Sequence, residues 1–114
     1  MKFSTEQINK ILEQEKDEYL WDLIHKLKND KRLKLPDEQI DDLFKRLKET
    51  YNYLMELGFS KKNLIEAFLY GEAVTPGYKD NPTIKNWVEK VGEIPENQYE
   101  DLLIIADKMQ KGLL

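Results

Sequence analysis

Apolar residues recur at intervals of three and four over most of the chain, which is the spacing of one face of an α-helix. No segment alternates between apolar and polar residues as a half-buried strand does, so no sheet is expected. The spacing predicts an all-α fold, a compact single-domain bundle of five to six short helices over residues 1–114. The predicted helices cover about residues 8–27, 36–57, 61–70, 82–91 and 96–110.

The apolar pattern also indicates which helices are central and which side of each faces the core. The first helix has a polar stretch at 13–18, which leaves open whether it is one long helix or two pieces. The third is apolar almost throughout and is expected to be buried on several sides. The residues expected to face inward near the C-terminus are Ile84, Trp87, Val88 and Val91, then Tyr99, Leu102, Leu103, Ala106 and Met109.

Two ten-residue segments, 35–44 (LPDEQIDDLF) and 94–103 (IPENQYEDLL), share one order of residue types, and looser copies begin at Phe3 and Phe59. The shared order is an apolar residue, Ser or Pro, two polar residues, Gln or Asn, and another apolar residue. Such a sequence is typical of the start of a helix. The copies are unevenly spaced, which argues against a solenoid, so we interpret them as helix starts and not as a functional repeat.

Local signals predict how individual helices begin and end. Ser4 and Ser60 are expected to cap the first and third helices, and Gly58 is expected to end the second in a left-handed conformation. Pro76 and Gly77 together favour a type II turn in the long stretch before the fourth helix. The other expected features are hydrophobic staples of Phe3 with Ile8 and of Phe59 with Leu64, first-turn prolines at 36, 82 and 95, an Asn81 cap, and a stop at Gly92.

The composition suits one soluble domain. The chain has 114 residues, of which 40% are apolar, and it contains no cysteine, so disulfides and thiolate metal sites are excluded. Its first 20 residues contain no apolar stretch like that of a signal peptide, and no apolar run is long enough to cross a membrane. We therefore expect a cytoplasmic protein, whose oligomeric state stays open.

Groups that could perform catalysis are few. His25 is the only histidine, and both serines are assigned to helix starts. Asp22 and His25 share a helix face, but a bundle metal site of that kind needs a second such pair. Neither a Walker-type loop nor a G-x-G-x-x-G segment is present. We expect no enzyme activity, no catalytic residues, no metal site and no cofactor.

The charge pattern favours a basic partner. The net charge is −4, and residues 93–107 contain five acids and no base. Such a surface attracts cationic proteins and can occupy a site that otherwise receives phosphates. The leading hypothesis is therefore a small acidic protein-binding domain, most specifically an immunity protein or antitoxin that neutralises a basic toxin such as a nuclease. The candidate contact residues are Tyr78, Glu93, Glu96, Glu100 and Asp101.

One stretch, residues 83–109, resembles the second half of phage-repressor-type helix-turn-helix domains. Those domains often read Thr-Ile-x-x-Trp, then Gly-x-Ile-Pro, then a helix ending in Leu-x-x-Ala. The matching residues here are Thr83, Ile84, Trp87, Gly92, Ile94, Pro95, Leu103 and Ala106. The resemblance implies an alternative function, DNA binding through the helix at 82–91. The residues that would contact DNA are then Lys79, Lys85, Asn86 and Lys90.

Overall fold

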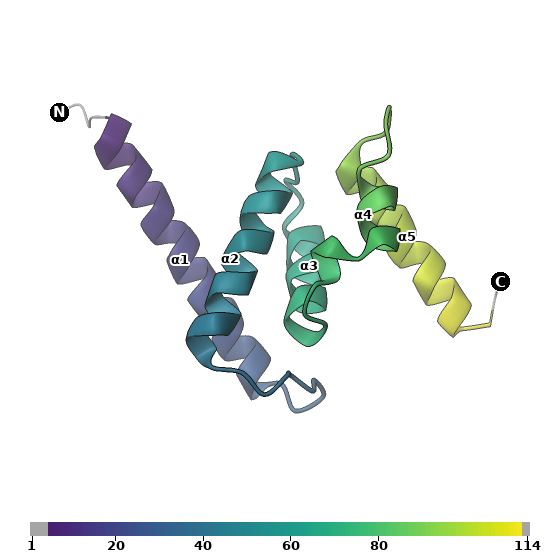
Figure 1. Cartoon of the computed structure of the whole chain (residues 1–114), viewed down its shortest axis with the longest axis horizontal. Coiled ribbons are helices and arrows are strands. Elements are labelled where there is room, and N and C mark those ends of the chain that lie inside the picture. Colours follow the sequence, from purple (N-terminus) through teal and green to yellow (C-terminus); the bar gives the residue numbers. More distant parts are fainter. Residues whose placement is uncertain (1–4, 113–114) are drawn as a thin grey trace.

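The computed structural model describes residues 5–112, which fold into five α-helices and one short 3₁₀-helix (Figure 1). No strand occurs in the described part of the chain, so the predicted all-α bundle is confirmed. The first helix is continuous through residues 13–18 and is the longest, with 25 residues. The elements are α1 (Thr5–Asn29), α2 (Ile40–Glu56), α3 (Lys62–Val74), η1 (Tyr78–Asp80), α4 (Pro82–Val88) and α5 (Pro95–Gln110).

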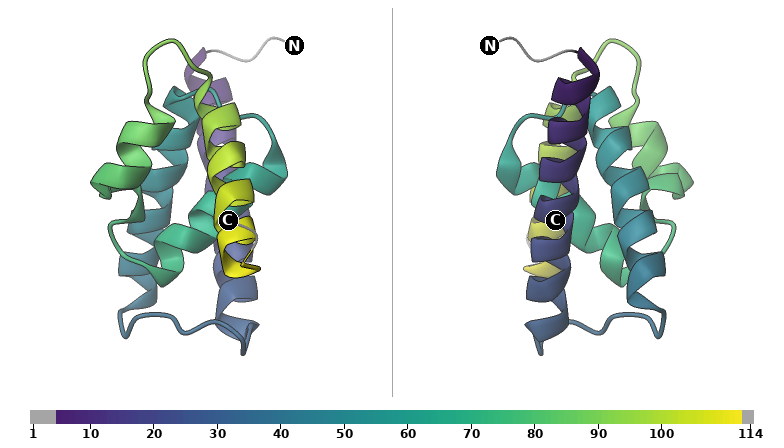
Figure 2. Two further views of the ribbon diagram at one scale, coloured as in Figure 1. Left: turned by 90° about the vertical axis from the view of Figure 1, so that its right-hand side faces the viewer. Right: turned by 90° about the vertical axis from the view of Figure 1, so that its left-hand side faces the viewer.

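The helices pack in series along an elongated body of 57 × 38 × 21 Å. Helix α1 packs on α2, α2 on α3, α3 on α5, and α4 on α5. Helices α1 and α5 therefore lie at opposite ends of the long axis, and they project onto each other when the molecule is viewed along that axis (Figures 1 and 2). Each is packed on one side only, which leaves long helical surfaces open at both ends.

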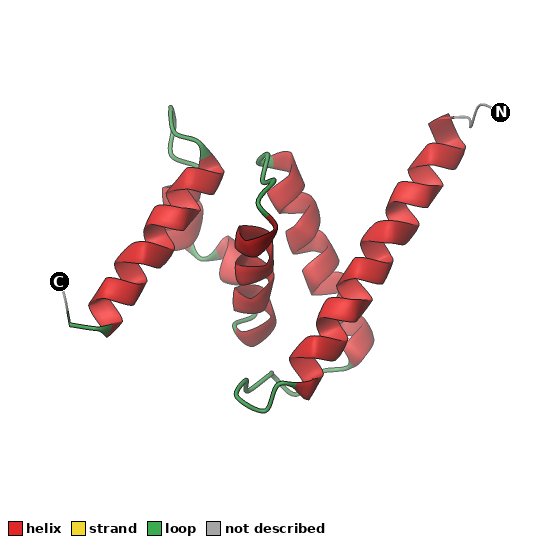
Figure 3. Ribbon diagram, turned by 180° about the vertical axis from the view of Figure 1, so that it is seen from behind, coloured by secondary structure: helices red, strands yellow, loops and turns green. Residues whose placement is uncertain are grey.

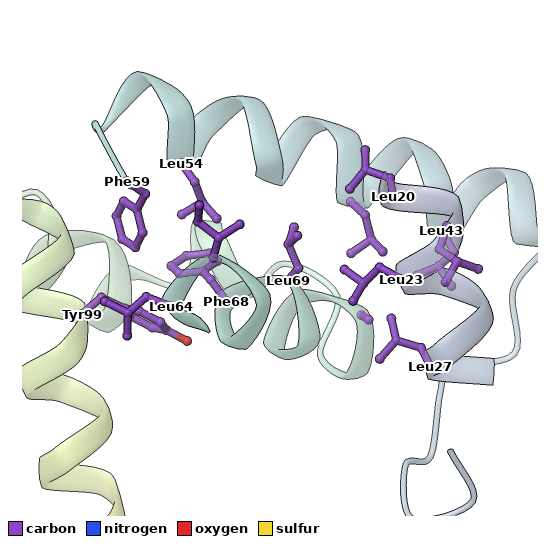
Figure 4. Packing of buried hydrophobic residues seen from close by; sticks show 14 of the residues in the cluster. Leu20, Leu23, Leu27, Leu43, Leu54, Phe59, Leu64, Phe68, Leu69 and Tyr99 are labelled. Carbon is purple, nitrogen blue, oxygen red and sulfur yellow. The ribbon is translucent and has the colours of Figure 1, made fainter. Parts of the chain in front are cut away.

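The core extends from the second half of α1 to the first turns of α5 (Figure 4). Its leucines from α1 and α2 meet α3, which is the central helix that its apolar sequence predicts. At the other end, the rings of Phe59, Phe68, Tyr78 and Tyr99 pack with centroids 4.9–6.3 Å apart. Full burial of one such leucine or phenylalanine stabilises the fold by roughly 1.5–3 kcal/mol.

Several helix ends agree with the local signals. Gly58 has φ of 86°, and the N–H of Phe59 donates to the Leu54 carbonyl at 3.0 Å, which is a Schellman motif at the end of α2. The Asn81 side chain accepts from the N–H of Thr83 at 3.0 Å, which caps α4. Gly77 has φ of 84°, and the Tyr78 N–H donates to the Thr75 carbonyl, as in a type II turn.

Two helix starts were predicted wrongly. Helix α2 begins at Ile40 and not at Pro36, because the Glu38 carboxylate is held by the Arg46 guanidinium and residue 39 is extended. Helix α3 has Lys61 at its N-cap, and the Ser60 hydroxyl donates to the Glu96 carboxylate at 3.4 Å instead of capping the helix. The expected Ser4 cap and the pairing of Phe3 with Ile8 lie outside the described residues.

The C-terminal helices are also less buried than predicted, and α5 lies at the outer edge of the molecule (Figure 3). Helix α4 ends at Val88, and Val91, expected in the core, is 97% exposed in the following loop. Ala106 and Met109 of α5 are exposed as well, because only the first turns of that helix lie against α3. The apolar spacing is present, but no other helix within residues 5–112 covers it there.

Candidate protein-binding surface

Exposed apolar side chains gather at the C-terminal end of the molecule. Of nine large apolar side chains that are exposed in the described part, five lie between residues 91 and 109. Val91 is 97% exposed and Ile94 61%, so both side chains lie largely in water. Exposed apolar side chains that cluster beside charged ones are a feature of interaction sites. We name Val91, Glu93, Ile94, Asp101 and Ile104 the C-terminal face.

A rigid hairpin of α4 and α5 positions this face. The Trp87 indole N–H donates to the Gln98 carbonyl at 2.7 Å, and the Gln98 side-chain amide donates back to the Trp87 carbonyl at 3.0 Å. Val88 and Tyr99, one residue further along each helix, are fully buried. The residues between α4 and α5 therefore project outward from two helices that are fixed to each other, as a preorganised contact surface requires.

The predicted acidic contacts do not all share this surface. Glu93 and Asp101 are exposed and form no ion pair with any described residue. Glu100 is half-buried, and its carboxylate pairs with the Lys61 ammonium at 3.4 Å. Glu96 is buried, and its carboxylate accepts from the N–H groups of Ser60 and Lys61 at 3.0 and 2.6 Å. Glu96 therefore holds the start of α3 and, unlike Glu93 and Asp101, is not exposed at the surface.

Tyr78 is also not an exposed anchor in this structure. Its ring packs edge-on against Phe68 with centroids 5.0 Å apart, and its hydroxyl lies 3.1 Å from that of Tyr99. Its backbone N–H donates to the buried Glu72 carboxylate at 2.6 Å. The absence of a side chain at Gly71 provides the space for the ring. Tyr78 thus joins the loop to the core instead of presenting it to a partner.

The residues assigned to DNA binding lie around α4, but two of the four are engaged locally. The Lys79 ammonium pairs with Asp80 at 3.0 Å. The Lys85 ammonium pairs with Glu89 at 3.2 Å and lies 5.3 Å from the centre of the Tyr53 ring. Asn86 and Lys90 are exposed. Few of these basic side chains are therefore free to contact the phosphates of DNA.

Sequence reasoning missed the apolar part of the C-terminal face, because it assigned Val91 to the core. The signal that could have indicated it is the Gly92 stop, since a residue just before such a stop can already lie outside the helix. Among the described residues, no three His, Asp or Glu side chains gather as metal ligands would. None of the described helices combines the length and apolar character that a bilayer-spanning segment needs.

Comparisons with known proteins add no assignment. No family model matches the chain, and neither the curated proteins nor the solved structures include a significant match.

Proposed function

We propose that this protein is a protein-binding domain whose C-terminal face contacts a basic partner. The observation that carries the proposal is the concentration of exposed apolar side chains at residues 91–109, interleaved with free carboxylates. Apolar groups supply affinity when they are buried by the partner, and the carboxylates guide a cationic protein to the surface.

In its most specific form, the proposed function is that of an immunity protein or antitoxin that binds a toxin such as a nuclease. A nuclease active site attracts phosphates. Glu93, in the exposed loop before α5, and Asp101, on the exposed side of α5, can occupy the place of those phosphates. Burial of Val91 and Ile94 against the toxin then contributes the nonpolar part of the interface.

Co-expression with the product of the neighbouring gene tests the proposal. We expect the two proteins to co-purify and the growth defect caused by the partner to be relieved. Val91→Asp and Asp101→Lys should each weaken the measured affinity by roughly tenfold or more, since each loses a contact worth about 1.4 kcal/mol or more.

Val74→Asp and Glu49→Lys serve as matched controls, because they make the same changes at exposed positions of α3 and α2. Controls that weaken the complex equally would show that another surface binds the partner. Absence of co-purification and of growth rescue would exclude the toxin–antitoxin form. If instead the protein shifts mixed duplex DNA at low salt and Lys90→Glu abolishes the shift, the helix-turn-helix alternative is favoured.

A further inference from the structure

A second open surface lies between α1 and α2 and reaches the start of α3. Two adjoining hollows of about 410 and 210 Å³ share Tyr19 of α1 and Tyr51 of α2 as lining residues. The larger continues to Leu12 and Met55, and the smaller reaches Ile65 at the start of α3. We name these five residues the α1–α2 groove.

The groove has an apolar lining with polar groups at its edge. Leu12 is 56% exposed, and Met55 is exposed as well. The rings of Tyr19 and Tyr51 lie with centroids 5.9 Å apart, and the Tyr19 hydroxyl donates to Glu66 at 3.5 Å. Leucine, methionine and half-buried tyrosines in a hollow between helices are the features that receive an amphipathic helix from another protein.

The charges beside the groove favour a basic occupant. Lys16, on its α1 side, pairs with Glu13 at 2.7 Å and donates to the Asn52 side chain at 2.8 Å. Lys48 is likewise held between Glu13 and Asp17 at 3.2 and 3.0 Å. Glu15 lines the larger hollow and Lys62 the smaller, and the Glu66 carboxylate lies beside them, where it accepts from the Tyr19 hydroxyl. Residues 5–22 of α1 as a whole contain six acids and two bases.

We propose that the α1–α2 groove binds a basic amphipathic helix of a protein partner. The apolar side of that helix lies between Leu12 and Met55, and its cationic residues lie toward Glu15 and the acidic surface of α1. A second copy of this chain is the poorer occupant, because its open helices are α1 and α5 and residues 95–110 of α5 contain four acids and one base. Like charges brought together at an interface oppose such pairing.

A model helical peptide of leucine and lysine, labelled with a fluorophore, tests the groove without knowledge of the partner. We expect saturable binding by the full chain in fluorescence anisotropy. Leu12→Lys should weaken binding by roughly tenfold or more, because a leucine contact is lost and a like charge is added. Met55→Lys, on the facing helix, should do the same. Ile40→Lys is the matched control, since Ile40 is also an exposed apolar residue on a helix but lies outside the groove.

Three results would overturn the proposal. One is a loss of affinity in Ile40→Lys as large as in Leu12→Lys and Met55→Lys. Another is equal binding of a peptide in which glutamate replaces every lysine, which would show that charge has no part. The third is an increase in molecular mass of the protein alone that Leu12→Lys abolishes, which would make a second copy the occupant. Val91→Asp should leave peptide binding unchanged, so the outcome is independent of the C-terminal face.

Discussion

Buried carboxylates at two sites hold backbone N–H groups that lie outside the regular hydrogen bonding of the helices. Glu96 accepts from Ser60 and Lys61 at the start of α3, and Glu72 accepts from the N–H of Tyr78 in the loop that follows it. A hydrogen bond to a charged group contributes about 1.5–3 kcal/mol, so these side chains help to hold the neighbouring segments in place.

Glu96→Ala should lower the free energy of unfolding by roughly 2 kcal/mol, because the N–H groups of Ser60 and Lys61 then lose their acceptor. Urea denaturation measures the change. Glu100→Ala is the control, since Glu100 makes one partly exposed ion pair with Lys61, which is worth about 0–1 kcal/mol. Equal losses in the two variants would contradict the role assigned to Glu96.

Gly71→Ala should destabilise the fold by roughly 1–3 kcal/mol, because the new Cβ would lie 2.7 Å from the Tyr78 ring. The effect should reverse in a Tyr78→Ala background, where the clash is absent and alanine is favoured over glycine in a helix by about 1 kcal/mol. A double-mutant cycle in urea measures both values. A loss of stability that persists without the Tyr78 ring would show that the contact is not the cause.

We expect the protein to lose stability at alkaline pH because of three of its tyrosines. Burial raises the pKa of Tyr99, Tyr53 and Tyr19 above the ordinary value of 10.0, with further increases from Tyr78, Glu89 and Glu66 respectively. Above that value the unfolded chain releases protons that the folded chain retains, so the free energy of unfolding falls as pH rises.

Urea denaturation between about pH 8 and about pH 11 should therefore show stability that falls as pH rises through about 10, by at most about 1.4 kcal/mol per pH unit for Tyr99 and by less for the more exposed Tyr53 and Tyr19. Tyr53→Phe should reduce the slope, because phenylalanine cannot ionise in the unfolded chain. A slope unchanged in this variant would show that Tyr53 does not contribute.

Individual helices were predictable where their signals are local. The Asn81–Pro82 start, the Pro95 start and the Gly58 stop need only neighbouring residues, and all three are present in the structure. The start of α2 depends instead on Glu38 meeting Arg46, and that of α3 depends on Glu96, which follows it by 35 residues. Apolar spacing and capping rules contain no information about such distant partners.

The candidate surfaces could likewise be predicted only where they depend on local sequence. The acidic character of residues 93–107 could be predicted, because it depends only on composition. The exposure of Val91 depends on α4 ending at Val88, and the burial of Glu96 depends on the contact between α5 and α3. The α1–α2 groove depends on how far the two helices diverge. Periodicity shows that a helix has an apolar side, but not whether another helix covers it.

Arg46 links α2 to α3 beside their apolar contact, which predicts a difference between two arginines. Its guanidinium, with a side chain 19% exposed, binds Glu38 and the last carbonyls of α3 at Glu72 and Ala73. Arg46→Lys should lower the free energy of unfolding by roughly 2–3 kcal/mol, because lysine cannot reproduce the planar fork. Arg32→Lys, at an 89% exposed side chain, should change it by less than about 0.5 kcal/mol, as surface substitutions usually do.

At the scale of the whole molecule, we expect negative charge to keep the exposed apolar surfaces of separate molecules from associating. The net charge is −4 at pH 7, and the isoelectric point is near 5.1. As pH falls toward that point the repulsion between molecules disappears, while Val91, Ile104 and Leu12 remain exposed. We therefore expect the average mass measured by light scattering to increase between about pH 7 and about pH 5, where the net charge approaches zero.

The variant Val91→Asp/Ile104→Asp should suppress this increase, because it removes apolar area from the C-terminal face. The control Ile40→Asp/Val74→Asp adds the same two negative charges at exposed positions elsewhere, so both variants shift the isoelectric point equally. If both suppress association to the same extent, net charge alone governs it. If only the first does, the C-terminal face is the surface through which the molecules associate.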